Sequence, residues 1–213
     1  MGSKDRLYAD IMAVHPEVTG SCNLVIVKQP DNSTVKFVVD CGLFQERQYS
    51  KNNDSLPFIP ANIDFCLVTH NHVDHVGRLP FMVNKGFDKE IYMTETTAKL
   101  LPLALEDSHK VLRDVAKRQN HSPLYSEADV SQTMRLIHPC KYNETIQIRP
   151  NIKATFFMNG HLMGASSILV QISWEEYETI NLFFSGDYSN KNMFFDVPDL
   201  PDWVLELPLT VVQ

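Results

Sequence analysis

The stretch Thr69-His70-Asn71-His72-Val73-Asp74-His75-Val76-Gly77 places three imidazoles and one carboxylate in six consecutive positions. It follows the apolar run Ile63 to Thr69, which predicts a buried strand because Pro60 precedes it and polar residues follow it. Side chains that leave the end of a strand can converge on a ligand. This density of ligand-type residues at a strand exit therefore predicts a metal site.

The spacing within the stretch suggests how the ligands divide. In an extended loop His70 and His72 point to the same side, because side chains alternate with a period of two, so both rings can hold one cation. Asp74 and His75 fall at a turn that opens a helix, about 3.3 Å further along per position, beside the place of a second cation. Histidine mixed with aspartate suits zinc, with manganese or iron as alternatives.

Two later strand ends offer further ligands. His161 follows the expected strand Ile152 to Phe157 and lies between Gly160 and Gly164, which permit close backbone approach. We expect it to complete the site of His70 and His72, and we expect Asp187, after another apolar strand, to bridge both metals. Alone, His161 fits a core histidine and Asp187 a turn cap. The remaining histidines are expected at the surface or in the core: His15, His109, His121 and His138.

Composition describes an ordinary globular chain. Its 213 residues, 44% hydrophobic and 21% charged, are enough for one sizeable core. A net charge of −7 argues against a chain that grips polyanions with its whole surface, although bound divalent cations would attract a phosphate locally. Four lysines and arginines at helical spacing are more typical of a solvated face than of phosphate contacts: Lys110, Arg113, Lys117 and Arg118.

The compartment is inferred from the cysteines and from the beginning of the chain. Met1 to Arg6 lacks an apolar segment and matches a myristoylation signal only loosely, and no apolar run approaches the ~20 residues of a membrane span. Four cysteines without a Cys-x-x-Cys pair lie in apolar surroundings and predict reduced, buried thiols: Cys22, Cys41, Cys66 and Cys140. We expect a cytoplasmic protein without a membrane anchor.

The order of elements predicts a layered α/β sandwich. Strands over 23–27 and 34–39, joined by a turn at 29–33, precede a polar loop at 51–60. Residues 91–93 form a strand that leads into a helix capped by Thr94, with Glu95 in its first turn and Pro102 as a kink or restart. The core face of this helix is expected at Leu101, Leu105, Ser108, Leu112 and Val115.

A second helix and a second group of strands complete the pattern. Ser126 to Asp129 resembles a capping box that opens a helix to about Leu136, and strands follow at 144–148, 152–157, 168–173 and 181–185. Two stacked sheets with helices outside are the expected α/β architecture, in one domain over residues 1–213. The apolar segment Trp203 to Gln213 stops in mid-strand, so we expect the front part of a longer protein.

With these motifs in order, the chain resembles the metallo-β-lactamase superfamily, whose signature is His-x-His-x-Asp-His followed by a later His and a later Asp. It resembles most closely the β-CASP branch, the nucleases that include bacterial RNase J and the endonuclease of pre-mRNA 3′-end processing. The features that carry the resemblance span nearly the whole chain: Glu17 to Cys22, Val39 to Gln45, Thr69 to Pro80, Pro123 to Asp129, Gly160 to Ala165 and Ser185 to Ser189.

The resemblance implies an αββα sandwich and a dinuclear zinc site. One zinc would be held by His70, His72 and His161, and the second by Asp74, His75 and Asp187, with Asp187 bridging. Asp40 would support the ligand loops through hydrogen bonds. Asp74 and Asp187 would also orient the attacking hydroxide, so the resemblance gives catalytic roles to Asp40, Asp74 and Asp187.

The chain also departs from the branch. There the Gly-Asp strand is followed by a strand that ends in an acidic residue, by a cap domain and by a further His. Here Gln213 is the last residue, Val211 to Gln213 fits the beginning of that strand, and Glu206 is a weaker substitute for the acidic residue. We therefore expect that this chain binds metal but cleaves RNA poorly or not at all by itself.

Three functions compete at this point. The first is a zinc-dependent phosphodiesterase acting on single-stranded RNA in mRNA processing or turnover. The second keeps the fold but hydrolyses a thioester or lactam, and the third is a non-catalytic interaction module. The intact set of six ligand positions favours the first. An uncovered strand edge also predicts self-association into homo-oligomers by edge pairing.

Overall fold

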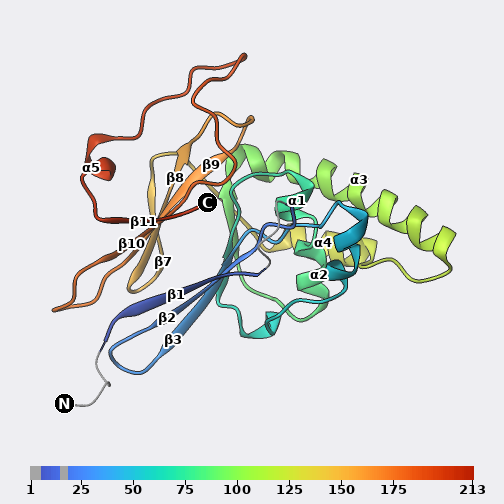
Figure 1. Ribbon diagram of the computed structural model, residues 1–213, viewed down its shortest axis with the longest axis horizontal. Helices are drawn as coiled ribbons and strands as arrows, with labels where there is room; N and C mark the ends of the chain where they lie inside the picture. Colours follow the sequence, from blue (N-terminus) through green and yellow to red (C-terminus); the bar gives the residue numbers. More distant parts are fainter. Residues whose placement is uncertain (1–5, 15–18) are drawn as a thin grey trace.

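The computed structural model describes residues 6–14 and 19–213. The expectations for His15, for Met1 to Asp5 and for the Glu17-Val18 part of the resemblance lie outside the described residues. Two stacked β-sheets form the centre of the molecule (Figure 1). The first sheet, in spatial order, contains β1 (Tyr8–Ala13), β2 (Asn23–Lys28), β3 (Thr34–Val39), β4 (Phe65–Leu67), β5 (Ile91–Thr94) and β6 (Ile137–Cys140).

The strand directions of the first sheet bring two chemically important loops to one edge. β1, β2 and β3 are antiparallel neighbours, whereas β3, β4, β5 and β6 run parallel. Because parallel strands end at the same edge of a sheet, Asp40 after β3 lies beside the His70 loop after β4. The predicted strand over Ile63 to Thr69 is confirmed in position but is shorter.

The second sheet has the same consequence for the later loops. Its spatial order is β11 (Leu209–Val212), β10 (Ile180–Phe184), β9 (Ser166–Ile172), β8 (Ile152–Met158) and β7 (Thr145–Arg149). Both β8 and β10 run antiparallel to β9, so they end at the same edge, where His161 and Asp187 follow them. The amide of Ser166 donates to the carbonyl of Thr69 at 2.9 Å and joins this edge to that of the first sheet.

Apolar side chains from both sheets fill the space between them. Phe37 and Phe65 of the first sheet stack with ring centroids 4.6 Å apart, and Phe156, Ile168 and Phe184 of the second sheet lie in the same cluster. Each of these side chains is buried, and full burial of such a residue contributes about 1.5–3 kcal/mol. This core holds the two sheets in register and therefore aligns the loops at their common edge.

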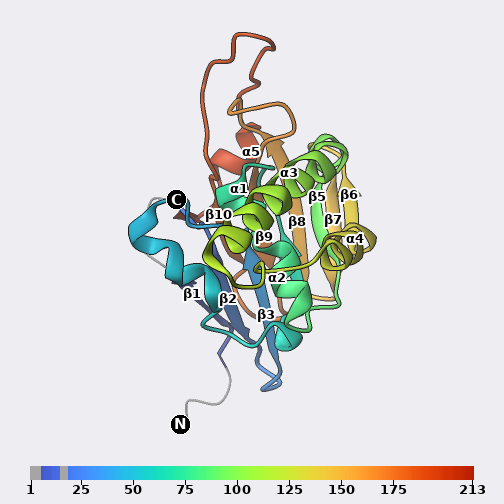
Figure 2. The ribbon, with the colours of Figure 1, turned by 90° about the vertical axis from the view of Figure 1, so that its right-hand side faces the viewer.

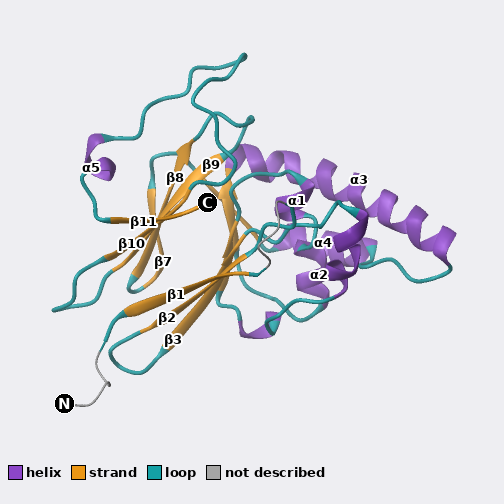
Figure 3. Cartoon of the chain, in the orientation of Figure 1, coloured by secondary structure: helices purple, strands orange, loops and turns teal. Residues whose placement is uncertain are grey.

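Helices cover the outer faces of the two sheets to different extents. The first sheet is covered by α1 (Val73–Val76), α2 (Leu79–Asn84), α3 (Glu95–Gln119) and α4 (Glu127–Arg135), as Figure 2 shows. The second sheet carries the single helical turn α5 (Asp202–Leu205) and long loops (Figure 3). Val204 of α5 packs on Phe157, Leu169 and Phe183. The predicted αββα sandwich is confirmed, with a thin outer layer on this side.

Local sequence signals are confirmed at the helix starts. The hydroxyl of Thr94 accepts a hydrogen bond from the Thr97 amide, and Ser126 forms a capping box with Asp129. Helix α3 continues through Pro102 without a break. The expected core position of Val115 is wrong, since this side chain is 40% exposed and Ala116 is buried instead. After Leu112 the next buried side chain is therefore four positions further along the helix, at Ala116, and not three.

Other expectations need correction. The polar loop at 51–60 is wrong in part, because two 3-10 helices occupy Arg47–Asp54 and Pro60–Asn62. Strand β1 went unpredicted because it is a largely exposed edge, and β6 because Pro139 lies within it, which only an edge strand tolerates.

The predictions for cysteines and basic residues agree with the structure. All four cysteines are free and buried. The side chains of Lys110, Arg113, Lys117 and Arg118 are all exposed, as a solvated helix face predicts. None of the helices within residues 6–14 and 19–213 is both long and apolar enough to cross a membrane.

Candidate metal centre

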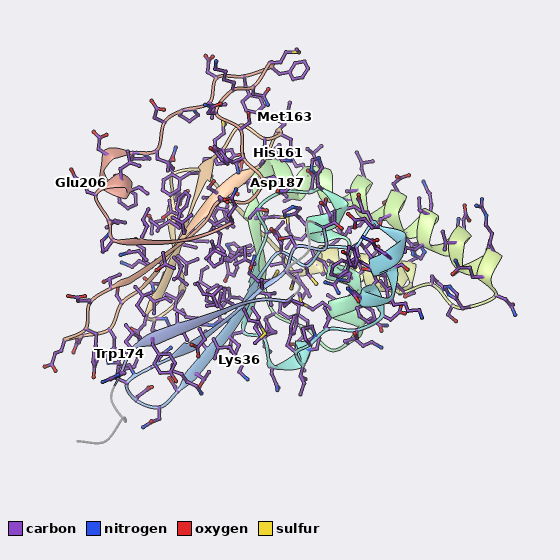
Figure 4. All side chains as sticks on the ribbon, viewed as in Figure 1. Lys36, His161, Met163, Trp174, Asp187 and Glu206 are labelled. Atoms are coloured by element: carbon purple, nitrogen blue, oxygen red, sulfur yellow. The ribbon has the colours of Figure 1, made fainter. Side chains whose placement is uncertain are left out.

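Four of the six predicted ligands gather at the common edge of the two sheets. His70, His72, His161 and Asp187 each offer one ligand atom, and these atoms lie within 4.8 Å of one another. His70 and His72 come from the loop between β4 and α1, and the other two follow β8 and β10. Figure 4 shows His161 and Asp187 together at this end of the sandwich, far from Lys36 and Trp174 at the opposite end.

His70 tests whether a metal ion fits this group. Its ring is fully buried, with Nδ1 3.0 Å from the hydroxyl oxygen of Thr69, while Nε2 has no hydrogen-bond partner among the described residues. Burial of the ring, together with the neighbouring His75 and His72, lowers the pKa of His70 to about 2. A neutral, buried nitrogen without a partner is unfavourable unless a ligand satisfies it, and a metal ion is such a ligand.

The rings of His161 and His72 complete the group. Nε2 of His161 lies 3.1 Å from Nδ1 of His72 and 3.6 Å from Oδ2 of Asp187. Burial lowers the pKa of His161, and the nearby Asp187 carboxylate opposes this effect. Nitrogen and carboxylate atoms so close to one another are a donor set that suits a cation such as zinc.

His75 lies between two carboxylates. Its Nδ1 is 2.8 Å from Oδ2 of Asp40, and its Nε2 is 3.4 Å from Oδ1 of Asp187. Burial lowers the pKa of His75, but the charges and hydrogen bonds of Asp40 and Asp187 outweigh it and raise the pKa to about 10. In return, the hydrogen bond from His75 lowers the pKa of Asp187 to about 2. A cation at Nε2 would therefore compete with a proton.

Asp40 holds this loop from the first sheet. Its buried carboxylate accepts from the Thr69 amide through Oδ1 and from the Thr69 hydroxyl through Oδ2, both at 2.8 Å, in addition to its contact with His75. Its φ of 62° is in the left-handed region, which Asp and Asn tolerate better than most residues. The hydrogen bonds that the resemblance implied for Asp40 are thus present.

Asp74 differs from the other predicted ligands. It lies half-buried in α1, and its carboxylate makes no hydrogen bond or ion pair with residues 6–14 or 19–213. It is outside the group of four, as is His75, although its negative charge slightly opposes the burial that lowers the pKa of His161. Its backbone is held firmly, because the carbonyl accepts from the Ser21 amide at 2.8 Å and packs against Gly42.

Sequence reasoning missed the role of Arg78, which joins the end of α1 to the long connection between β3 and β4. This side chain is fully buried, and its Nε donates to the Gly42 carbonyl at 2.6 Å while Nη1 donates to the carbonyls of Asn52 and Ser55. The guanidinium also lies 5.0 Å from the centre of the Phe44 ring. The signal was a lone charge inside the apolar run from Val76 to Pro80.

A cavity of about 590 Å³ lies over the group of ligands. Asp40, His75, His161 and Asp187 all line it, together with residues at the ends of strands in both sheets. A small anionic group could therefore reach the ligand atoms from solvent. The arrangement combines imidazoles, carboxylates and a cavity, which is the make-up of a hydrolytic metal site.

The metallo-β-lactamase superfamily domain matches residues 28–183, which is well over half of the chain. The chain belongs to this superfamily, as its motifs predicted.

Relatives extend the comparison. A ribonuclease of Thermus thermophilus is 32% identical over 193 residues, covering 89% of this chain and 40% of the relative. The endoribonuclease Ysh1 of Aspergillus fumigatus is 29% identical over 180 residues, covering 82% of this chain and 19% of the relative. Among solved structures, a class B3 di-zinc metallo-β-lactamase from an Alaskan soil metagenome has a TM-score of 0.48 and 18% identity, over 85% of this chain and 61% of that one. The chain spans less than half the length of both ribonuclease relatives.

Proposed function

We propose that this chain is the metal-binding part of a zinc-dependent phosphodiester hydrolase of the β-CASP branch, acting on single-stranded RNA. The observation that carries the proposal is the group of four ligand atoms within 4.8 Å, which includes the unpartnered Nε2 of buried His70. Two relatives named for RNA cleavage support RNA as the substrate. The four buried free thiols favour a reducing compartment, and we propose a cytoplasmic location.

In this proposal two zinc ions share the site, with manganese as the alternative metal. His70, His72 and His161 hold the first, and Asp74, His75 and Asp187 hold the second, with Asp187 shared. When bound, the ions supply positive charge for the phosphate and acidify water at neutral pH. Such charge is needed locally because the chain as a whole carries −7.

The chain's own residues prepare this chemistry. The low pKa of His70 keeps its ring neutral, so that Nε2 offers a lone pair at any working pH. Asp40 contacts Nδ1 of His75 and thereby directs Nε2 toward Asp187. The carboxylates of Asp74 and Asp187 orient a water molecule for attack on phosphorus, and the lowered pKa of Asp187 keeps its carboxylate ionised near neutral pH.

The experiment measures zinc per chain and the cleavage of a labelled single-stranded RNA. We expect about two zinc ions per chain. Asp74→Ala is expected to abolish any hydrolysis, while Asp88→Ala, at an exposed carboxylate paired with Lys89, leaves it unchanged. Unchanged cleavage by Asp74→Ala contradicts the proposed site. A stoichiometry near one contradicts the dinuclear centre, and zero contradicts metal binding.

The same preparation separates the competing functions. Single-stranded DNA, a thioester and a β-lactam are offered in parallel with RNA. Hydrolysis of the thioester or lactam without cleavage of RNA favours a hydrolase of another substrate class. Stable zinc binding without hydrolysis of any of them favours a non-catalytic module.

A further inference from the structure

Two separate loops carry the later ligands, and Asn159 joins them. His161 lies in the loop after β8, and Asp187 lies in the loop after β10. The buried side-chain amide of Asn159 donates through Nδ2 to the carbonyl of Ser185 at 3.1 Å and to the carbonyl of Asp187 at 2.9 Å. One amide group therefore holds the backbone of the Asp187 loop at two points.

The remaining polar atoms of Asn159 complete the connection. Its Oδ1 accepts from the backbone amide of His161 at 3.3 Å, and its backbone carbonyl accepts from the Ser189 amide at 3.0 Å. The orientation of the amide is determined by these partners, because two carbonyl oxygens face Nδ2 and an N–H faces Oδ1. Both donors of this buried amide group and its acceptor are thus satisfied.

We propose that Asn159 is a positioning residue that sets the separation of His161 and Asp187 and thereby the affinity of the site for zinc. The inference rests on the proposed metal site. Because metal–ligand bonds are about 2 Å long, the ligand atoms of one site must keep a fixed separation. Nε2 of His161 and Oδ2 of Asp187 are 3.6 Å apart but come from separate loops. A shift of either loop changes that separation directly.

Neighbouring hydrogen bonds do not duplicate this role. Asn192 donates to the carbonyl of Gly160, and Ser167 donates to the carbonyl of Ser185. The Asn192 contact joins the Asp187 loop to the His161 loop at Gly160, and the Ser167 contact joins β9 to the beginning of the Asp187 loop, but neither contacts a ligand residue. Asn159, in contrast, contacts the backbone of both ligand residues, His161 and Asp187.

Asn181 provides a matched control for burial and hydrogen bonding. It lies in β10 and is 4% exposed where Asn159 is 6% exposed. Its Nδ2 donates to the Thr179 carbonyl, and its Oδ1 accepts from Nε2 of Gln171. It stands near the beginning of the strand, whereas Asp187 follows the end. Loss of its amide therefore perturbs the same sheet without touching a ligand loop.

The test measures the affinity for Zn²⁺ alone by chelator competition and the visible absorption of the Co²⁺-loaded chain. Asn159→Ala removes all side-chain contacts, and Asn159→Asp keeps the shape and the acceptor but loses both donors. We expect both variants to weaken Zn²⁺ binding by about 10–100-fold and to shift the Co²⁺ bands. Asn181→Ala is expected to bind like the unaltered chain.

The outcomes separate this inference from the proposed function. Zn²⁺ affinity of Asn159→Ala within twofold of the unaltered chain overturns the inference, as does an equal loss in Asn181→Ala. If Asn159→Ala does not fold, Asn159→Ser, which keeps one donor, is compared at a temperature where it is folded, by the same criterion. If the unaltered chain binds Zn²⁺ and hydrolyses a thioester or a β-lactam but no RNA, the proposed function fails while this comparison still decides the role of Asn159. If it binds no Zn²⁺, both fail.

Discussion

The two halves of the candidate metal centre are supported in different ways. In the early half, on the loop between β4 and α1, two of the three rings belong to the core: His70 is fully buried and His75 is nearly so, whereas His72 is exposed. The later half lies on two loops outside the core, where the side chain of His161 is 25% exposed and that of Asp187 is 49% exposed. Folding alone therefore forms the early half, whereas the later half depends on a few hydrogen bonds such as those of Asn159.

Backbone contacts explain the rigidity of the early half. The four-residue helix α1 is too short to be stable by itself. Its carbonyls are held instead by amides from neighbouring loops, in the pairs Leu43 to Val73, Ser21 to Asp74 and Cys41 to His75. Substitutions in this half are therefore expected to reduce stability, and substitutions in the later half to reduce metal affinity.

Asp40→Ala is expected to give the largest effect. It leaves the Thr69 amide, the Thr69 hydroxyl and Nδ1 of His75 buried without their partner and places alanine at a left-handed φ. The free energy of unfolding, measured in urea without metal, is expected to fall by about 3–5 kcal/mol. Asp64→Ala, which removes one hydrogen bond to the Lys36 amide at the other end of the sheet, is expected to lose about 1 kcal/mol. Equal losses in the two variants would contradict the expectation that the hydrogen bonds of Asp40 stabilise the early half more than an ordinary hydrogen bond does.

Gly42→Ala tests the close packing of the same half. A Cβ at this position would lie 1.5 Å from the carbonyl oxygen of Asp74, so α1 would have to move. We expect a loss of about 3 kcal/mol in the free energy of unfolding. At Gly86 the nearest atom to an added Cβ is 3.4 Å away, although its φ of 100° strains any substitution. Gly86→Ala should therefore lose less, and the reverse order would contradict the packing described for Gly42.

His161→Ala tests the later half. Loss of one imidazole ligand is expected to weaken Zn²⁺ binding by about 100-fold or more, which corresponds to about 2.7 kcal/mol. The free energy of unfolding without metal is expected to change by less than about 1 kcal/mol, because the ring is partly exposed. Chelator competition and urea unfolding measure the two quantities. His121→Ala, at an exposed ring beyond α3, is the control and is expected to change neither.

The pH dependence of stability gives the smallest expected effect. Folding raises the pKa of His75 to about 10, so its stabilising contribution is complete below the unfolded-state value of about 6.5 and is lost as pH rises toward 10. Without metal, the free energy of unfolding is expected to fall by about 2 kcal/mol between pH 7 and pH 9. Urea unfolding across this range checks it. Asp40→Asn should flatten the profile, and an unchanged profile in that variant would contradict the assigned cause.

Sequence reasoning succeeded where a pattern is local. The helix starts at Thr94 and Ser126 could be predicted because each capping hydrogen bond involves a residue only three positions away in the sequence. The crowded ligands of the His70 loop and the alternating apolar strands likewise predicted the sandwich and its edge. The prediction for Val115 failed because the placement of helix α3 on the sheet determines which side chain is buried.

The amino-acid sequence by itself determined the superfamily, most of the strands and the residue types available for a metal. Only the tertiary structure decided that four ligands meet within 4.8 Å while Asp74 and His75 lie outside that group. It also decided that the side chain of Arg78 is buried and that the amide of Asn159 links two ligand loops. The physical reason is distance along the chain. A cap or an alternating strand is encoded by neighbours, whereas these contacts depend on the stacking of two sheets whose strand ends are brought to one edge by the whole core.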